Sequence, residues 1–363
     1  MCRDGADRIV PRGAVLDGHG SDRDASTADG AADDGVRHRP AARDVWADTT
    51  GRMRVVWQHP AHGEWGAVMG DVVAYRMEGV PVRGGELRVG VWGERGPVIV
   101  AVHGITSSHL AWTLIGPELG RDHRVVAVDL RGRGGSRDLP GPYGMAAHAA
   151  DVAEVIRAYA DGPVLLVGHS MGGFVVAETA RRFPDLVERL ILVDGGAPLP
   201  LPPGVDPSAG PAALEEAIAT TVGAVFARLT MTFPDRDAYL ALWRQHPSFG
   251  PWPEGADAYL AYDVVGQEPE LRAACRMEAA VRDGQDLYAL PGMAPEPLPR
   301  PAVFLRAPRG MFDDPDAPLY PPGRASEWLP GVTESDVPDV NHYTITLGRE
   351  GAETVAAAVR AAP

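Results

Sequence analysis

Short apolar runs alternate with amphipathic stretches along most of the chain after residue 72. The apolar runs predict buried strands at 97–102, 124–130, 164–167, 187–193 and 301–306, and a weaker one at 332–337. The stretches between them carry apolar residues at helical spacing and predict helices at 110–119, 146–160, 172–182 and 353–362. Segment 80–92, with Gly84 and Gly85 at its centre, predicts a hairpin. Strands that alternate with helices in this way predict an α/β fold built on a mostly parallel sheet.

Two parts of the chain lack this alternation. Residues 1–68 are rich in Asp, Arg, Ala and Gly, and they hold too few large apolar side chains to offset the entropy of folding. Residues 211–290 predict several helices that carry many aromatic side chains, and such an insertion is expected to form a lid over the carboxyl ends of the strands. The pattern therefore predicts a disordered N-terminal extension over 1–68, a core over 69–196 and 299–363, and a helical cap over 197–298.

Composition narrows the class of protein. Among the 363 residues, 34 basic residues, all of them arginine, face 49 acidic residues, and the resulting net charge of −15 repels a polyanion such as DNA. Only two cysteines are present, Cys2 and Cys275, so neither a disulfide framework nor a thiolate metal site is expected. The chain has no run of 18 apolar residues and no signal-peptide core. We expect a cytoplasmic protein that binds neither nucleic acid nor a membrane.

One short motif points directly to chemistry. Gly168-His169-Ser170-Met171-Gly172 follows a predicted buried strand and precedes a predicted helix, which is the context of a nucleophile elbow. A serine hydroxyl reacts only where a base can reach it and donors await the oxyanion, so it must project from a sharp turn. Glycines two positions before and after Ser170 leave room for that turn.

Further motifs extend the pattern. His103-Gly104-Ile105 follows a strand, an aspartate and a glycine-rich turn occupy 129–136, and Asn341-His342-Tyr343 lies near the C-terminus. With the elbow at 168–172, these motifs make residues 80–362 resemble the α/β-hydrolase superfamily, in its serine-nucleophile branch with a helical cap. The resemblance implies an eight-stranded, mostly parallel sheet with helices on both faces and an inserted helical cap.

The resemblance also implies roles for individual residues. Ser170 is the expected nucleophile, and His342 is the expected general base, because it alone among the histidines follows the last predicted strand and precedes the closing helix. The backbone N–H groups of Ile105 and Met171 are the expected oxyanion hole. His103 and His169 are expected to shape their loops rather than to react.

The acid that completes a triad is left open between two places. Most relatives carry it after the seventh strand, where this chain has Gly310, and Asp313 and Asp314 follow only slightly later. Some branches of the superfamily use the end of the sixth strand, where this chain has Asp194. The missing acid at position 310 favours Asp194, with Asp313 and Asp314 as alternatives.

These residues predict a serine hydrolase that needs no cofactor or metal and cleaves an ester, thioester or lactone bond through an acyl-enzyme. The aromatic residues in the predicted cap favour a small-to-medium apolar substrate. Carbon–carbon bond hydrolysis and acyl transfer use the same triad and stay as alternatives, as does a binding protein on this scaffold. The sequence does not specify the oligomeric state.

Overall fold

A computed structural model describes residues 45–47, 53–55, 73–201 and 204–361. Most of the extension that we predict to be disordered, residues 1–68, lies outside the described residues. Within it, the structure describes two short strands, β1 (Val45–Ala47) and β2 (Met53–Val55), which pair in antiparallel fashion.

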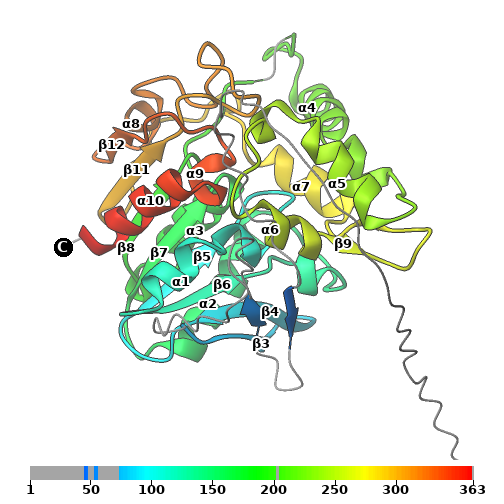
Figure 1. The fold of residues 1–363 in the computed structure, drawn as a ribbon. Coiled ribbons are helices and arrows are strands. Elements are labelled where there is room, and N and C mark those ends of the chain that lie inside the picture. The colour runs from blue at the N-terminus through cyan, green and yellow to red at the C-terminus, as the bar shows by residue number, and fades with distance from the viewer. Residues whose placement is uncertain (1–44, 48–52, 56–72, 202–203, 362–363) are drawn as a thin grey trace, which may run out of the picture.

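The centre of the fold is an eight-stranded sheet, which confirms the predicted class (Figure 1). Its order is β12-β11-β8-β7-β5-β6-β4-β3. Strand β4 runs antiparallel to both of its neighbours, β3 and β6, and the other neighbouring strands of the sheet are parallel. The strands are β3 (Tyr75–Val82), β4 (Gly85–Trp92), β5 (Val98–Val102), β6 (Arg124–Val128), β7 (Val164–His169), β8 (Val187–Val193), β11 (Ala302–Arg306) and β12 (Thr333–Asp336).

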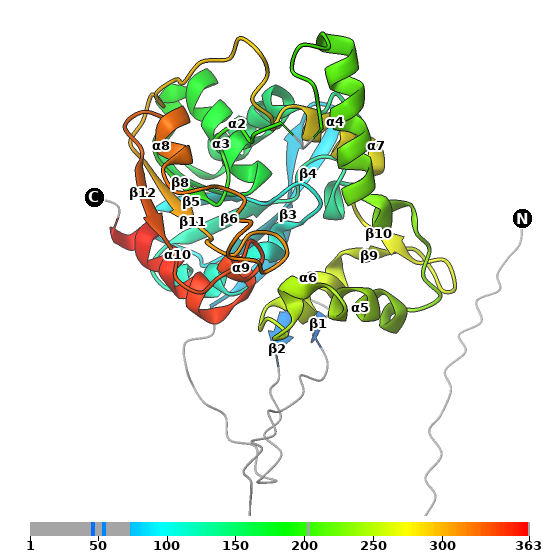
Figure 2. The same cartoon turned by 90° about the horizontal axis from the view of Figure 1, so that it is seen from above.

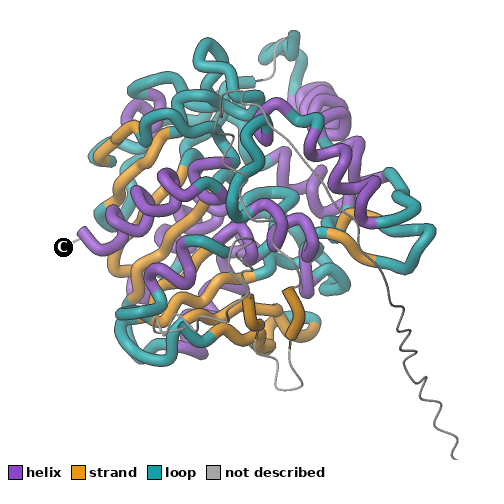
Figure 3. Tube along the Cα trace, in the orientation of Figure 1, coloured by secondary structure: helices purple, strands orange, loops and turns teal. Residues whose placement is uncertain are grey.

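Helices cover both faces of this sheet, as predicted (Figures 2 and 3). One face packs against α2 (Met145–Tyr159), α3 (Met171–Arg182) and α8 (Arg324–Trp328), and the other against α1 (Ile115–Leu119), α9 (Thr344–Leu347) and α10 (Arg349–Ala361). Alternate strand residues, such as Ile99 and Val100, belong to the two separate buried clusters. Among the described helices, none combines the length and the apolar character needed to cross a membrane.

The predicted helix 110–119 is interrupted in the structure. It consists of a 3-10 helix, η1 (His109–Trp112), followed by α1 (Ile115–Leu119). Pro117 explains the break, because proline lacks an N–H and its ring collides with the carbonyl four residues earlier in a continuous helix. Two further 3-10 helices, η2 (Gly134–Ser136) and η3 (Pro184–Leu186), lie in loops of the core.

The segment between β8 and β11 contains most of the helices that we predict for the cap. Its elements are α4 (Pro211–Val225), η4 (Ala227–Thr230), α5 (Arg236–Arg244), η5 (Pro247–Phe249), α6 (Ala256–Tyr262), β9 (Val264–Val265), β10 (Arg272–Ala273) and α7 (Met277–Gln285). We call the part of this segment from the start of α4 to the end of α7, residues 211–285, the insertion. The hydroxyl of Tyr262 donates to Asp129 just after β6 over 2.7 Å, so the insertion contacts loops at the carboxyl ends of the strands. That it forms a separate cap domain stays a prediction.

Helix α3 approaches the ends of β5 and β8 so closely that backbone packs directly on backbone. A Cβ atom on Gly172 would overlap the carbonyl oxygen of Val102, and one on Gly173 would overlap that of Gly195. These glycines therefore set the distance between the elbow helix and the sheet.

Gly172→Ala is expected to destabilise the fold strongly, because the new methyl group can be accommodated only by moving the backbone of β5 or α3. We expect a loss of about 2–4 kcal/mol in the free energy of unfolding, measured by urea denaturation. Gly162→Ala is the matched control, since a Cβ there meets no atom within 4 Å, and its effect should stay within about 0.5 kcal/mol. Equal losses in both variants would contradict this account of Gly172.

Candidate active site

Ser170 lies at the turn between β7 and α3, in a backbone conformation that residues other than glycine rarely adopt. Its φ is 56° and its ψ is −125°. The N–H of Ser170 donates to Val193 O over 2.9 Å, and this bond holds the turn against the end of β8. Ser170 as a whole is only partly buried, at the carboxyl end of β7. The local geometry is that of the predicted nucleophile elbow.

His342 and Asp194 meet at the same edge of the sheet. His169 stands opposite Val193 in the parallel register, so Ser170 and Asp194 each follow a strand end on neighbouring strands. The Nδ1 atom of His342 lies 2.7 Å from Asp194 Oδ2, and both side chains are almost fully buried. A carboxylate at this distance holds the proton on Nδ1, which leaves Nε2 as the acceptor.

The carboxylate of Asp194 is itself held in place. Its Oδ1 accepts the N–H of Ala307 over 3.0 Å, and its own N–H donates to Leu305 O over 2.8 Å. The φ of Asp194 is 45°, a strained value for a residue other than glycine. Both supporting contacts come from β11 and the residues just after it, so the neighbouring strand fixes the direction of this side chain.

The two alternative acids have other partners. Asp313 forms an ion pair with Arg309, with 2.8 Å between Oδ1 and Nε, and Asp314 accepts the N–H of Asp316 over 2.9 Å. Of the three acids weighed from the sequence, only Asp194 contacts His342. Gly310 has a φ of 56°, and a Cβ there would overlap the carbonyl oxygen of Ala317. In this loop conformation, position 310 has no room for a carboxylate side chain.

The hydroxyl of Ser170 forms no hydrogen bond to another described residue, His342 included. Such catalytic contacts are commonly long in the absence of substrate and shorten when it binds. His169 contacts both the ring and the backbone of His342. Its ring centroid lies 4.7 Å from that of His169, and the Nε2 atom of His169 is 2.8 Å from the carbonyl oxygen of His342. Burial lowers the pKa of His169 well below its usual value, so its neutral ring donates this bond through Nε2–H.

The predicted oxyanion loop passes beside the serine. A Cβ placed on Gly104 would lie 3.1 Å from Ser170 Cβ and 3.5 Å from its Oγ. Neither the N–H of Ile105 nor that of Met171 donates to another of the described residues. Their predicted role as the oxyanion hole stays a prediction.

His103 fixes the peptide group that carries the Ile105 N–H. Its side chain is fully buried, its Nε2 accepts the N–H of Leu130 over 3.0 Å, and its Nδ1 lies 2.6 Å from Gly104 O. With Nε2 as acceptor, the ring carries its proton on Nδ1 and donates it to the Gly104 carbonyl. A bond to this carbonyl polarises the same amide and strengthens its N–H as a donor. The sequence predicts a loop-shaping role for His103, and this contact is a specific form of it.

Aromatic side chains of the insertion surround the residue that follows the histidine. Tyr343 packs against Trp243, Phe249 and His246 with ring centroids 5.9, 5.3 and 5.4 Å apart. Most aromatic residues of the insertion are thus part of a buried cluster, as helical spacing predicts. Tyr343 links this cluster to His342, since the ring centroids of Tyr343 and His342 are 5.7 Å apart.

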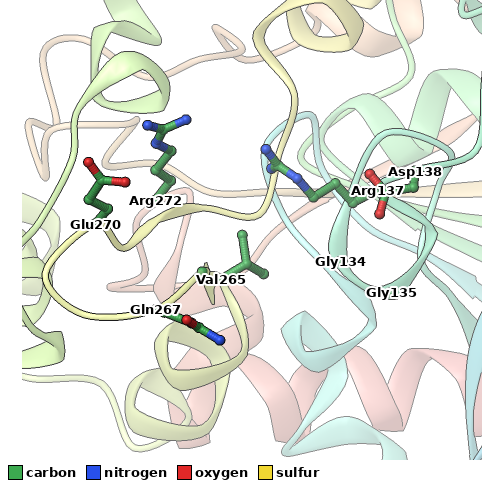
Figure 4. A pocket seen from close by; sticks show the side chains of 9 residues that line it. Gly134, Gly135, Arg137, Asp138, Val265, Gln267, Glu270 and Arg272 are labelled. Atoms are coloured by element: carbon green, nitrogen blue, oxygen red, sulfur yellow. The ribbon is translucent and has the colours of Figure 1, made fainter.

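A cleft lies elsewhere, between the turn after β6 and the β9–β10 hairpin (Figure 4). Its volume is about 650 Å³, and its charged lining residues are Arg137, Asp138, Glu270 and Arg272. None of the predicted site residues lines it. The cleft is therefore distinct from the group formed by Ser170, His342 and Asp194.

Sequence reasoning missed two buried arginines at the oxyanion loop. Arg133 Nε donates to Ile105 O over 2.8 Å, and Arg228 Nη2 donates to Thr106 Oγ1 over 2.8 Å. Arg133 belongs to the glycine-rich turn at 129–136, which the sequence analysis treats as part of a motif without assigning its side chains. For Arg228 the sequence carries no signal, because its partner is 122 residues away.

Comparison with known proteins points to one fold family. The family model described as "alpha/beta hydrolase fold" matches residues 97–244. An uncharacterized protein of Mycobacterium tuberculosis is 38% identical over 101 residues, which cover 28% of this chain and 30% of that protein. A lipase of the same species is 34% identical over 110 residues, covering 30% of this chain and 41% of the lipase. The chain thus aligns with less than half the length of these curated relatives.

Solved structures give a longer match at lower identity. The thioesterase domain from the curacin biosynthetic pathway superposes with a TM-score of 0.60 and 21% identity, covering 79% of this chain and 99% of that domain. At this identity, the likeness establishes the fold and leaves the substrate open.

The burial of His103 predicts a pH dependence of stability. Burial, opposed by the nearby charge of Asp129, lowers the pKa of His103 to about 3, against about 6.5 in the unfolded chain. Below pH 6.5 the unfolded state takes up a proton that the folded state does not. The stabilisation is therefore complete above pH 6.5 and is lost as the pH falls towards 3.

Between pH 7 and pH 5 this histidine should cost the wild type about 2 kcal/mol of unfolding free energy. In His103→Asn that share disappears, so urea denaturation at the two pH values should give a smaller difference for the variant than for the wild type. Equal differences would mean that His103 is not held neutral in the folded protein.

Proposed function

Because the chain belongs to the α/β-hydrolase superfamily, we propose that it is a serine hydrolase that cleaves an ester, thioester or lactone bond through an acyl-enzyme. In this proposal Ser170 is the nucleophile, His342 is the general base and Asp194 is the acid. The N–H groups of Ile105 and Met171 form the oxyanion hole.

The observation that carries the proposal is the buried contact between His342 Nδ1 and Asp194 Oδ2 at 2.7 Å, beside a serine with a φ of 56°. A buried carboxylate that orients an imidazole serves a base that must become positively charged during reaction. Buried contacts between histidine and aspartate also occur elsewhere in this core, at His109 with Asp129, and what distinguishes His342 is the strained serine of the elbow at the same strand ends. The two features together are typical of nucleophilic catalysis.

The geometry supports a two-step reaction. Ser170 Oγ attacks the carbonyl carbon while His342 Nε2 takes its proton, and the charge on the histidine is stabilised by Asp194. The carbonyl oxygen becomes negative and accepts the two backbone N–H groups of the oxyanion hole. His342 then gives its proton to the leaving group. In the second step it takes a proton from the water that attacks the acyl-enzyme, and it gives this proton to Ser170 Oγ as the acid is released.

Three features support an apolar substrate of small to medium size. Aromatic side chains of the insertion extend to Tyr343 beside His342. One relative is named a lipase, and one structural neighbour is named a thioesterase domain. A cytoplasmic location is part of the proposal and is supported by the low cysteine count.

Carbon–carbon bond hydrolysis and acyl transfer to another acceptor are alternatives within the same machinery. Product analysis separates them, since transfer requires an added alcohol or amine and hydrolysis requires only water. A binding protein without catalysis is the alternative from another class, and the strained serine with its oriented histidine speaks against it.

A fluorophosphonate probe tests the nucleophile. We expect the wild-type protein to be labelled covalently and Ser170→Ala to remain unlabelled, because the probe reacts only with an activated serine. Hydrolysis of a panel of 4-nitrophenyl esters of graded acyl length should then give the size of the acyl pocket, with Ser170→Ala as the blank. A folded wild-type protein that resists the probe would favour the binding protein.

Asparagine substitutions test the acid. Asp194→Asn should lower kcat/KM for the best ester by roughly 10³–10⁴-fold, because the imidazole loses its orienting carboxylate. Asp313→Asn is the matched control and should stay within about threefold of the wild type, since Asp313 pairs with Arg309 instead. The reverse ranking of the two variants would make Asp313 the acid.

A further inference from the structure

Two buried arginines reach consecutive residues of the oxyanion loop. Arg133 comes from the turn after β6 and donates to Ile105 O, while Arg228 comes from the insertion and donates to Thr106 Oγ1, each over 2.8 Å. Arg133 is fully buried, and 14% of the Arg228 side chain is exposed. Arginine is seldom buried to this extent without a partner that balances its charge.

In both cases the balancing carboxylate comes from the insertion. Asp283 of α7 lies 2.5 Å from Arg133 Nη1, and Asp263, just after α6, lies 3.3 Å from Arg228 Nη1. Burial opposes ionisation of Asp283, but the charges of His148 and Arg133 outweigh it and lower its pKa. The ion pair therefore stays charged at neutral pH, and the planar guanidinium group has a fixed direction.

These contacts determine where the Ile105 N–H points. Two peptide groups share the Cα atom of Ile105. The first contains Gly104 O and the Ile105 N–H, and the second contains Ile105 O. His103 holds the first oxygen and Arg133 the second, while Cys275 Sγ, also from the insertion, lies 3.8 Å from the second. The Ile105 N–H belongs to the first of these peptide groups, beside Ser170, and with the planes on both sides of the Ile105 Cα atom fixed it has little freedom to rotate.

We propose that Arg133 and Arg228 are positioning residues of the oxyanion hole, oriented by Asp283 and Asp263, so that docking of the insertion completes the hole. This inference rests on the proposed function, because it assigns a role to a donor of that same site. The insertion then does more than cover the substrate. It supplies the charges that hold the catalytic loop in its working conformation.

The test compares two buried arginine–aspartate pairs that lie close together. Asp283→Asn weakens the Arg133 pair, which touches the oxyanion loop. Asp151→Asn weakens the Arg131–Asp151 pair, which is also buried, with 2.7 Å between the charged groups, and which does not contact residues 105 or 106. Both variants remove one buried charge from the same part of the core, so a general loss of stability should affect both.

For Asp283→Asn we expect kcat on the best 4-nitrophenyl ester to fall about 10- to 100-fold with KM within about threefold, since an oxyanion donor acts in the transition state. Inhibition by phenylboronic acid, which becomes tetrahedral on the serine oxygen, should weaken by a similar factor. Asp151→Asn should lower the melting temperature about as much as Asp283→Asn does, but it should keep kcat within about threefold of the wild type.

Thr106→Val covers the case in which Asp283→Asn does not fold. It removes the hydroxyl that accepts from Arg228 and leaves both ion pairs and the longer contact of Arg228 with Thr106 O, at 3.4 Å, in place. We therefore expect kcat to fall several-fold, with a smaller loss of melting temperature than in Asp283→Asn. Equal losses of kcat in Asp283→Asn and Asp151→Asn, or an unchanged kcat in Thr106→Val, would overturn the positioning role. A rise in KM alone would also overturn it. Fluorophosphonate labelling of the wild type is the separate check on the proposed function, so the two failures are distinguishable.

Discussion

The arrangement of the whole site depends on one steric constraint, the direct contact of backbone with backbone at the start of α3. A Cβ at Gly172 would overlap Val102 O, and one at Gly195 would overlap Ser170 O, so the ends of β5, β7 and β8 converge on a single helix terminus. This convergence forces Ser170 to a φ of 56° and brings Gly104 and Asp194 to its two sides. The strain at the serine is offset by the packing of the sheet and helix around it.

Buried charge joins the insertion to this core at several points. Asp129, at the end of β6, accepts Tyr262 of the insertion over 2.7 Å and the Gly135 N–H over 2.8 Å. Burial opposes its ionisation, but the neighbouring His109 outweighs it and lowers the pKa of Asp129 to about 2. Ion pairs and charged hydrogen bonds tolerate few alternative geometries, whereas apolar contacts can slide. These contacts therefore restrict how the insertion lies against the loops at the carboxyl ends of the strands.

Local patterns in the sequence were sufficient to predict most elements of the fold, but they did not predict which distant residues lie next to each other. The six single strands occur within two residues of their predicted ends. Five of them are buried and mostly apolar runs, whereas β12 is polar and largely exposed, which explains its weaker signal in the sequence. The hairpin begins earlier than predicted, at Tyr75, since an edge strand with polar residues carries no such run. Ser170, His342 and the loop at 103–105 were predictable from motifs. The pairing of Arg133 with Asp283 was not, because the two residues are 150 positions apart and no local pattern links them.

The order of the strands explains why Asp194, rather than a residue after β11, contacts His342. In the order β11-β8-β7, the end of β8 is one strand nearer to Ser170 than the end of β11. The loop after β11 turns its backbone towards the histidine segment, where Gly310 O accepts the His342 N–H over 2.9 Å. The carbonyl oxygen of Ala317 occupies the space that a side chain at 310 would need. Asp194 follows the adjacent strand β8 and contacts His342 instead, and its backbone adopts a strained φ of 45°. Strand β11 keeps a part in the site nonetheless, because the N–H of Ala307 fixes the second oxygen of that carboxylate.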